Sequence, residues 1–427
     1  MQPLVARRIL MLLENHPYPQ DSRVRQEAAA LVSAGYQVSV IAPAGARQRW
    51  HEIHDSVSVY RYPMPPNANG LLGYVLEYGC AMIASFFLSL LVFIREGFDV
   101  LHAHNPPDTF VFLAAFYKLF GKRFVFDHHD LAPEMYYARF PGRGNRLLHG
   151  MLLWCERLSY RLSDRAITTN GSYKALASER HGIPAKRITV VRNGPALDRL
   201  RPTEPIAELR QKAPIIIGYA GTMGVQDGVD YLLRALHHLV NDMQRKDFFC
   251  VLVGDGDAMD SLQSLATQLQ LTEHLLFTSW VEPAAVPRYL STADICVAPE
   301  PSNPYNDRST MIKIMEYMAM AKPIVAFDLP EHHVSARTAA VYVPGNDEMA
   351  FAQALAQLMD DPARRQVMGS AGRQRVEDTL AWRHSAPHLL SAYQAVFAGP
   401  HASPRSSTTL VQTQEKELLP HEKPHVS

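Results

Sequence analysis

The sequence predicts an α/β protein of two doubly wound domains, each a parallel sheet covered by helices on both faces. Three observations lead to this fold class. The chain has 427 residues, more than one hydrophobic core usually organises. Short, almost continuously apolar runs alternate with helical patterns in both halves, as buried parallel sheets require. A proline-rich stretch with little strand character, residues 195–213, separates the halves and is expected to be a linker.

The first domain is expected to span residues 1–194. Its first helix, predicted over 23–34, stops before Gly35, as helices commonly end at a glycine. Helical patterns separate the later strands too, which favours parallel pairing. The six strands expected in this domain are 6–13, 36–43, 99–104, 122–127, 164–170 and 186–193.

The second domain is expected to span residues 214–379 and repeats the alternation. A last helix over residues 380–398 follows it. Residues 399–427 are polar and weakly patterned, so we expect a disordered tail. The six strands expected in this domain are 214–220, 248–256, 274–280, 293–299, 322–328 and 339–344.

Charge and cysteine content exclude several classes of protein. Lys and Arg number 42, and so do Asp and Glu, which argues against a general nucleic-acid binder. The four cysteines lie far apart without metal-ligand spacing, and a disulfide framework needs a higher density. The N-terminus lacks the pattern of a cleaved signal peptide. A reducing, cytoplasmic location is therefore expected.

Residues 78–94 form a run of 17 residues without charge, the lower limit for crossing a bilayer. A crossing would separate the strands at 6–13 and 36–43 from those after residue 98. We therefore expect a helix that is buried in the fold or docked on a membrane face, and a span is the least favoured reading.

Glycines mark the turn after the strand at 214–220. Gly218, Gly221, Gly224 and Gly228 follow one another there, and such a turn lets backbone N–H groups approach a phosphate. The spacing differs from that of the dinucleotide-binding fingerprint. A tight turn without a ligand stays an open alternative.

A second pattern starts at Ser309. Ser309 or Thr310 is expected to cap a helix that begins near Met311. Lys313 and Glu316, three residues apart, share one face of that helix. A cation and a carboxylate there suit a nucleoside diphosphate, with charge for the phosphates and hydrogen-bond acceptance for the ribose. A surface ion pair is the alternative.

Histidines end two strands of the first domain. His102 and His104 lie in DVLHAHNPPD, and His128 and His129 in FVFDHHDLAPE. Ligands of open α/β sheets bind at the carboxyl ends of strands. Adjacent residues on extended chain face opposite ways, which disfavours His128 and His129 as ligands of one metal. A metal site, structural histidines, and a histidine facing a sugar or phosphate stay open; the pair 332–333 is expected at the surface or behind a site.

Taken in order, these segments resemble glycosyltransferase family 4, the retaining sugar-nucleotide transferases of the GT-B fold. The resemblance runs from residue 7 to about residue 397. It implies two Rossmann-like domains facing a cleft, with the C-terminal helix crossing back to the first domain. It rests on DVLHAHNPPD, FVFDHHDLAPE, ITVVRNG, IGYAGTMGVQDGVDYLLRAL, VLVGDG, ADICVAP and MIKIMEYMAMAKPIVAFD.

The resemblance implies roles for particular residues. Glu316 matches the glutamate that holds the nucleotide ribose. Gly221, with Thr222 and Gly254, matches the loops near the donor phosphates. His129 matches the histidine beside the transferred sugar.

Other matched positions border the expected cleft. Asn193 and Gly194 match the Asn-Gly that closes the first domain, and Arg192 and Asn193 are assigned to the donor side. The acceptor is expected against the first domain, near Arg23, His104 and Asp108.

Two departures from the family pattern affect the donor site. Arg308 stands where many relatives carry a glutamate, eight positions before Glu316. Gln226 and Asp227 replace the basic pair that often follows the glycine turn. We infer that Lys313 supplies the missing cation, with Arg308 or Arg192.

The expected reaction moves a hexosyl or N-acetylhexosaminyl group from a nucleoside diphosphate to an acceptor hydroxyl, with retention and without metal or other cofactor. The uncharged helix at 78–94 suggests a lipid-linked or polysaccharide-precursor acceptor and peripheral contact with the inner face of the cell membrane.

Two other functions stay open. One is a metal-dependent hydrolase that uses His102, His104 and His128. The other is a catalytically inactive binding subunit of the same fold, which the Arg308 departure would allow.

Overall fold

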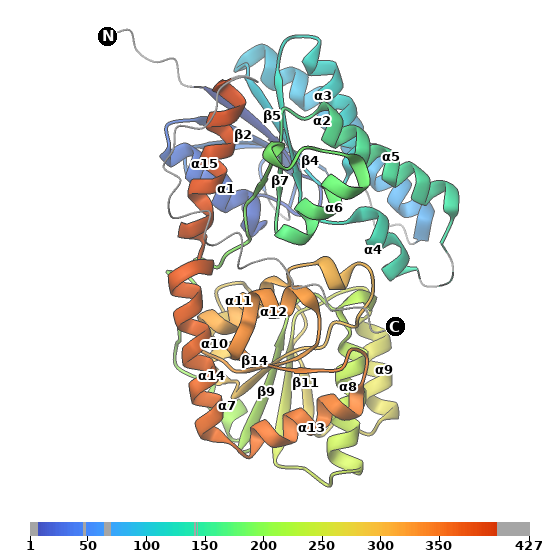
Figure 1. Ribbon diagram of the computed structural model, residues 1–427, viewed down its shortest axis with the longest axis vertical. Helices are drawn as coiled ribbons and strands as arrows, with labels where there is room; N and C mark the ends of the chain where they lie inside the picture. Colours follow the sequence, from blue (N-terminus) through green and yellow to red (C-terminus); the bar gives the residue numbers. More distant parts are fainter. Residues whose placement is uncertain (1–6, 46–47, 64–69, 141, 143, 399–427) are drawn as a thin grey trace. The chain divides into compact units, whose positions relative to one another are not determined.

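The computed structural model describes residues 7–45, 48–63, 70–140, 142 and 144–398, so the tail expected at 399–427 lies outside the described residues. The chain forms two compact units (Figure 1). Of the described residues, unit 1 comprises those up to 136 and those in 144–193 and 385–398. Unit 2 comprises the described residues of 137–142 and 194–384. The stretch at 195–213, expected as a linker, belongs to unit 2 and contains the short helix α7 (Ala207–Arg210).

Within the described residues, the sheet of unit 1 has eight strands in the order β3-β4-β2-β1-β5-β6-β7-β8. All neighbours pair in parallel except β3 and β4. The six expected strands are confirmed. The strands are β1 (Arg8–Leu12), β2 (Gln37–Pro43), β3 (His51–His54), β4 (Val57–Tyr62), β5 (Val100–His104), β6 (Arg123–His128), β7 (Arg165–Thr168) and β8 (Ile188–Val190).

The hairpin of β3 and β4 is absent from the sequence prediction. Asp55 and Ser56 make its turn with φ of 47° and 65°. Neither residue is a glycine, so the turn gives little signal in the sequence. β3 reads His-Glu-Ile-His and lies at the sheet edge, where a strand needs no apolar run.

Helices cover both faces of this sheet. The expected first helix is confirmed as α1, with Asp21 capping it by accepting from the Val24 N–H at 2.8 Å, and with Gly35 after its end at φ of 88°. The helices are α1 (Ser22–Ser33), α2 (Gly70–Arg95), α3 (Val111–Lys118), α4 (Ala132–Arg139), α5 (Arg146–Leu162) and α6 (Gly171–His181).

Helix α2 packs against the sheet of unit 1 through small residues. Ala81, Ser85 and Ser89 are buried there, while Ile83 and Phe87 are 63% and 64% exposed on the other side. The stretch Leu76–Arg95 is long and apolar enough to cross a bilayer by length and composition alone. One side of α2 is thus buried against the sheet, and the opposite side is exposed.

The sheet of unit 2, over its described residues, has six strands in the order β11-β10-β9-β12-β13-β14, all parallel. Each matches an expected strand. Its strands are β9 (Ile215–Ala220), β10 (Phe248–Val253), β11 (Leu275–Phe277), β12 (Ile295–Ala298), β13 (Ile324–Phe327) and β14 (Ala340–Val343).

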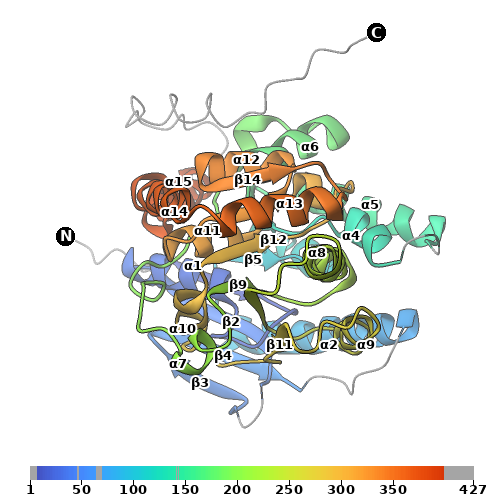
Figure 2. The same ribbon diagram turned by 90° about the horizontal axis from the view of Figure 1, so that it is seen from below.

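Figure 2 shows α8, α9 and α13 on one side of the unit 2 sheet and α7, α10 and α11 on the other. The remaining helices of this unit are α8 (Val229–Asn241), α9 (Met259–Gln268), α10 (Val286–Thr292), α11 (Ile312–Ala319), α12 (Pro330–Ala336), α13 (Glu348–Met359) and α14 (Pro362–Arg375).

Strand order locates a ligand-binding edge in each unit. From β1 the chain adds strands on one side through β2, then continues on the other side with β5. From β9 it does the same through β10 and then β12. Ligands of open α/β sheets bind at such switch points, beyond the carboxyl ends of the strands.

The last helix, α15 (Trp382–Ala398), begins in unit 2 and from Ser385 belongs to unit 1, so the expected crossing back is confirmed. The Tyr393 hydroxyl lies 2.8 Å from His102 Nδ1, and the Tyr393 ring lies 5.7 Å from that of Tyr36. This helix therefore completes the core of unit 1.

The two sides of α2 predict different costs of mutation. Val92→Ala removes buried methyl groups from the side that faces the sheet and should lower the free energy of unfolding by roughly 2 kcal/mol. Phe87→Ala, on the bare side, should change it by about 0.5 kcal/mol or less. Urea denaturation of both variants measures this. Equal losses would contradict the assignment of the two sides.

Candidate active site

The first candidate site lies in unit 2, where the chain leaves β9. The N–H of Gly221 donates to the Val253 carbonyl at 3.0 Å. Gly254, after β10, has φ of 133°, and a Cβ there would come within 2.0 Å of the Gly221 carbonyl oxygen. Only glycine is compatible with that backbone and that contact. The two loops assigned to the donor phosphates therefore touch each other.

Lys313 lies beside this turn, on α11. Its Nζ is 2.5 Å from Glu300 Oε1 and 3.6 Å from Asp227 Oδ1. Nζ also donates to the Tyr219 hydroxyl at 2.9 Å. Burial alone would lower the pKa of Lys313, but the negative charge of Glu300, with that of Asp227, raises it well above its usual value. The sequence prediction of a cation near the glycine turn thus corresponds to a buried, charged ammonium group.

Asp227 holds the other side of the turn. Its Oδ2 accepts from the Gly224 N–H at 3.0 Å and from Gln226 Nε2 at 3.1 Å. Burial raises the pKa of Asp227, and nearby Lys313 opposes that rise. Backbone N–H groups of a glycine turn beside a lysine commonly bind phosphate oxygens. The Asp227 carboxylate occupies a position of this kind.

The prediction missed Glu300, which is fully buried two residues after β12. Its Oε2 lies 3.8 Å from Nε2 of His332, a residue that is also fully buried and whose Nδ1 is 2.9 Å from the Phe327 carbonyl oxygen. Burial lowers the pKa of His332, which favours the neutral ring. Of the two adjacent histidines at 332–333, His333 is exposed, whereas His332 is buried beside Glu300. Applying the strand-end rule to carboxylates as well as histidines would have found Glu300.

The expected side-chain cap of α11 is wrong. The helix begins at Ile312 with Met311 in the capping position and no side-chain cap. Ser309 Oγ donates to the Tyr305 carbonyl at 2.8 Å, and Thr310 Oγ1 donates to Glu331 Oε2 at 2.9 Å. Both hydroxyls thus donate to groups outside α11, and the residue in the capping position, Met311, offers no side-chain acceptor.

Three further predicted donor-site residues lie on the same edge. Glu316 is partly buried one turn after Lys313, and burial raises the pKa of its carboxyl group, opposed by Lys313. Thr222 is exposed in the glycine turn. Arg308 donates to the Pro304 carbonyl at 3.0 Å within its own loop. Their roles stay predictions.

The second candidate site is a buried polar cluster at the strand ends of unit 1. Arg23, on α1, donates to both oxygens of Asp127 at 2.7 Å, and its Nη2 lies 3.1 Å from Glu27 Oε1. His104 Nδ1 lies 2.9 Å from Asp127 Oδ2. Burial favours neutral Asp127, but Arg23 outweighs it and holds the pKa well below its usual value. Burial raises the pKa of Glu27 well above its usual value.

The residues predicted on the acceptor side are buried. Arg23, His104 and Asp108 are 4%, 1% and 4% exposed, and their role toward an acceptor stays a prediction. The buried charge of Asp127 accounts for the burial of Arg23 and His104, because it needs both as partners. Asp108 accepts from Asn105 Nδ2 at 3.1 Å, and Asn105 Oδ1 in turn accepts from the His129 N–H at 2.8 Å. These residues position the loops around His129.

His128 and His129 point to opposite faces of the sheet, as predicted. His128 Nδ1 lies 2.7 Å from the Tyr160 hydroxyl, and its Nε2 lies 3.6 Å from Glu156. The His129 ring is on the other face, 3.8 Å from Asp127, with 12% of its side chain exposed. Burial lowers the pKa of His129, but Asp127 raises it above its usual value overall.

The three-histidine site of the hydrolase alternative is therefore not assembled. Among the described residues, the groups close enough to share a cation are Glu27, His102, His104 and Asp127, without His128. Arg23 already forms ion pairs with both of those carboxylates. A positive charge in that place disfavours a second cation.

Arg192 and Asn193 follow β8 at the same edge of unit 1. Arg192 is buried. Asn193 Oδ1 accepts a hydrogen bond from Arg23, which ties the end of this segment to the cluster. Contact of either residue with a donor stays a prediction.

Comparison with known proteins gives two matching family models. The Glycosyl transferase 4-like domain matches residues 20–194, and Glycosyl transferases group 1 matches residues 214–361. A glycogen synthase of Mycobacterium tuberculosis is 26% identical over 394 residues, covering 88% of this chain and 91% of that protein. A phosphatidyl-myo-inositol mannosyltransferase of Mycobacterium leprae is 26% identical over 378 residues, covering 88% and 92%.

Solved structures agree on the fold. HepE of Anabaena in complex with UDP-glucose has a TM-score of 0.66 and 16% identity, covering 91% of this chain and 99% of that one. Two Rossmann-like sheets with a helix that returns to the first define the GT-B architecture. The chain belongs to the family 4 type of GT-B glycosyltransferases, and its activity is glycosyl transfer.

A double variant tests the buried ion pair. Glu300→Gln leaves the Lys313 ammonium without its nearest counter-charge and should lower the free energy of unfolding by about 3 kcal/mol. Adding Lys313→Met removes the second charge and should recover much of that loss. Denaturation of the two single variants and the double variant measures the coupling. Strictly additive losses would contradict a direct pair.

Asp108 predicts a pH effect on stability. Burial raises the pKa of Asp108 from 3.8 to about 7, so the folded protein holds this proton more tightly than the unfolded chain. The favourable contribution is complete below the unfolded pKa and is lost as pH rises through about 7. Asp108→Asn should therefore gain up to roughly 4 kcal/mol over wild type between acid and mildly alkaline pH. A difference in unfolding free energy that does not change with pH would contradict this.

Proposed function

We propose that this glycosyltransferase moves a sugar from a nucleoside diphosphate to an acceptor hydroxyl with retention of configuration. The observation that carries the proposal is the charged Lys313 beside the glycine turn, at the switch point of the unit 2 sheet. A diphosphate there meets a cation, backbone N–H groups and the first turn of α11. The nucleotide in the similar HepE structure supports this class of donor.

The same edge offers a place for the nucleoside. Glu316 follows Lys313 by one helical turn, and its carboxylate has no hydrogen-bond or ion-pair partner among the described residues. A carboxylate accepts readily from vicinal ribose hydroxyls. Lys313 thus contacts the diphosphate of the donor, and Glu316 contacts its ribose.

Retention by front-face transfer suits these residues. The bond between the anomeric carbon and the diphosphate oxygen breaks, and its electron pair leaves with the diphosphate. The acceptor oxygen bonds to the same face of that carbon, and its proton passes to a leaving phosphate oxygen. This step needs a cation for the departing charge rather than a carboxylate nucleophile. Lys313 supplies that cation, and His129 is assigned to the transferred sugar.

We infer a lipid-linked or polysaccharide-precursor acceptor, used in the cytoplasm at the inner face of the membrane. Two observations support this choice. The mannosyltransferase relative is named for a phosphatidyl-inositol acceptor. The bare apolar side of α2 lies on unit 1, to which the acceptor is assigned. The sugar is proposed to be a hexosyl or N-acetylhexosaminyl group.

Donor binding tests the proposal. Thermal shift with UDP-, GDP- and dTDP-sugars should give one specific stabilising donor for the wild type. Lys313→Met and Glu316→Ala should each weaken that donor at least tenfold, because each removes a charge-assisted contact. Lys246→Met, at an exposed lysine of the same unit, is the matched control and should bind as wild type does.

The product distinguishes the remaining readings. Nuclear magnetic resonance of the glycoside should show the donor's anomeric configuration retained, and an inverted product would contradict the front-face step. A wild type that binds its donor tightly but never turns over would indicate an inactive binding subunit.

A further inference from the structure

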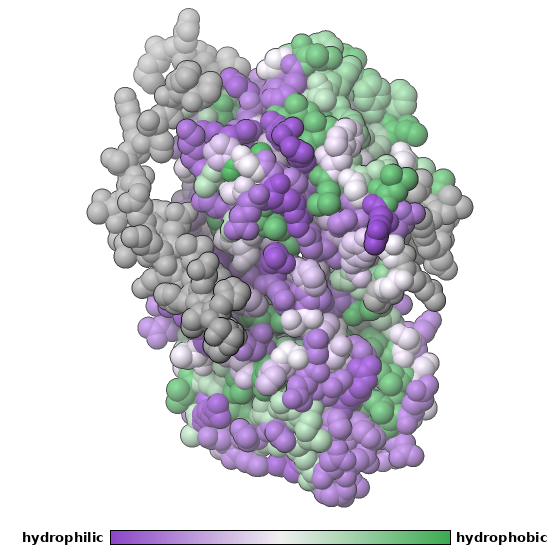
Figure 3. All heavy atoms as spheres, turned by 45° about the vertical axis from the view of Figure 1, so that its right-hand side comes forward, coloured by the Kyte–Doolittle hydropathy of each residue, from purple (hydrophilic) through white to green (hydrophobic). Residues whose placement is uncertain are grey.

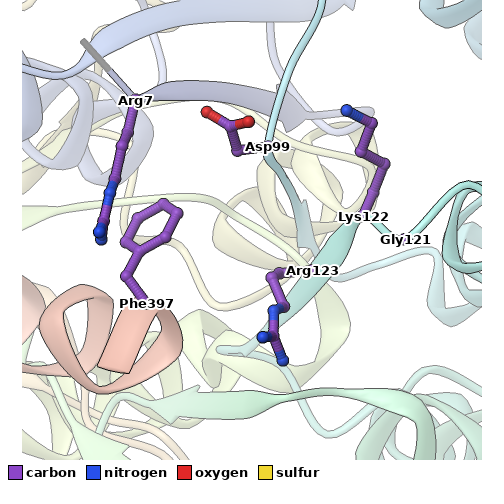
Figure 4. A pocket seen from close by; sticks show the side chains of 6 residues that line it. All are labelled: Arg7, Asp99, Gly121, Lys122, Arg123 and Phe397. Atoms are coloured by element: carbon purple, nitrogen blue, oxygen red, sulfur yellow. The ribbon is translucent and has the colours of Figure 1, made fainter. Parts of the chain in front are cut away.

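A cationic pocket lies on unit 1 at the opposite end of the strands from the buried cluster. Its volume is about 380 Å³. Arg7, Asp99 and Arg123 stand at or just before the first residues of β1, β5 and β6, whereas the cluster stands at the other ends of these strands. Figure 4 shows the lining residues, which are Arg7, Asp99, Gly121, Lys122, Arg123 and Phe397.

Positive charge dominates this lining, with three cations against one carboxylate. Asp99 Oδ2 already accepts from the Arg8 N–H at 2.9 Å. The Arg7 guanidinium lies 3.8 Å from the centre of the Phe397 ring, beside which it runs in Figure 4. Within the described residues, neither Arg7 nor Lys122 forms an ion pair with a carboxylate. The pocket thus has the charge to attract an anion.

An apolar surface covers the neighbouring helices. Between α2 and α3 there is a groove of about 340 Å³, lined only by Met82, Ile83, Phe86, Phe87, Phe112, Leu113 and Phe116. On α5, Leu147, Met151 and Trp154 are more than half exposed, and the Trp154 ring lies 5.9 Å from that of Phe112. We call these exposed parts of α2, α3 and α5 the apolar face. Figure 3 shows hydrophobic residues gathered at the upper right, the side on which these helices lie in Figure 1.

The apolar face continues to the rim of the cationic pocket. The Phe116 ring, at the groove, lies 5.3 Å from that of Phe120, which lies 5.7 Å from that of Phe93. The Lys122 ammonium lies 5.3 Å from the centre of the Phe93 ring. Leu119, just before this point in the chain, is 82% exposed. Apolar and cationic surfaces therefore meet at the ends of α2 and α3.

We propose that unit 1 docks on an anionic phospholipid membrane, with the apolar face against the acyl chains and a lipid phosphate in the cationic pocket. A surface with bulky apolar residues and a basic rim binds the boundary between headgroups and acyl chains. A protein partner would match the apolar groove but would not account for Arg7 and Lys122, the two cations of the pocket that have no carboxylate partner among the described residues; Arg123 pairs with Asp164 at 3.4 Å. Crossing the bilayer is excluded, because Ala81, Ser85 and Ser89 of α2 are buried against the sheet.

This docking proposal rests on the proposed function, because a lipid-linked acceptor would require the enzyme to bind a membrane. Vesicle binding is nevertheless measured without turnover. If donor binding fails while vesicle binding holds, only the proposed glycosyl transfer to such an acceptor is lost. If vesicle binding fails while the donor binds, only the docking is lost.

Vesicle flotation of the full chain tests the proposal. Phosphatidylcholine vesicles that contain phosphatidylglycerol should bind the wild type at least tenfold more tightly than phosphatidylcholine alone. Arg7→Gln and Lys122→Gln should each lower binding to the anionic vesicles about fivefold. Ile83→Ser with Phe87→Ser should abolish binding to both. Lys246→Gln and Trp280→Ser change an exposed lysine and an exposed tryptophan of unit 2 and should bind as the wild type does.

Contrary results are equally distinct. Equal binding to neutral and anionic vesicles would overturn the phosphate pocket, and unchanged binding of the Ile83 and Phe87 double variant would overturn the apolar face. Inorganic phosphate that stabilises the wild type but not Lys122→Gln, in a protein that floats with neither vesicle, would assign the pocket to free phosphate instead. Melting temperatures of all variants show whether each is folded.

Discussion

A buried cation between two carboxylates organises the ligand-binding edge of each unit. In unit 1 the cation is Arg23, between Asp127 and Glu27. In unit 2 it is Lys313, between Glu300 and Asp227. Such groups are costly to bury unless each charge is matched, so the arrangement fixes the helices that carry them against the strand ends. Positions of the glycine turn, of α11 and of the loops around His129 follow from these pairs.

Most of the fold could be read from the sequence, because buried parallel strands are continuous apolar runs that need no knowledge of their partners. The β3–β4 hairpin could not, since an edge strand such as His-Glu-Ile-His has no apolar run and its turn has no glycine. The same logic applies to the opposite faces of His128 and His129, which follow from the strand repeat alone. The features that the sequence predicted correctly are therefore those that depend on residues close together in the chain.

The same distinction between local patterns and distant partners applies to the candidate site. Lys313 and the glycines were found because their residue types and spacing carry the chemistry. Glu300 and the role of Arg23 were not, because each depends on a partner from a distant part of the chain. The capping prediction failed for a similar reason, since Thr310 bonds to Glu331, which no local pattern reveals. The apolar run at 78–94 predicted a long helix. The sequence did not show which side of α2 packs on the sheet, and the structure shows that its small residues do.

Helix α15 has a consequence for the order in which the protein is made. Its residues from Ser385 belong to unit 1, and Tyr393 supplies the hydroxyl beside His102 in the core of that unit. Those residues leave the ribosome only after all of unit 2 has been synthesised. Unit 2 can then finish folding first, while the core of unit 1 stays incomplete until α15 has been synthesised.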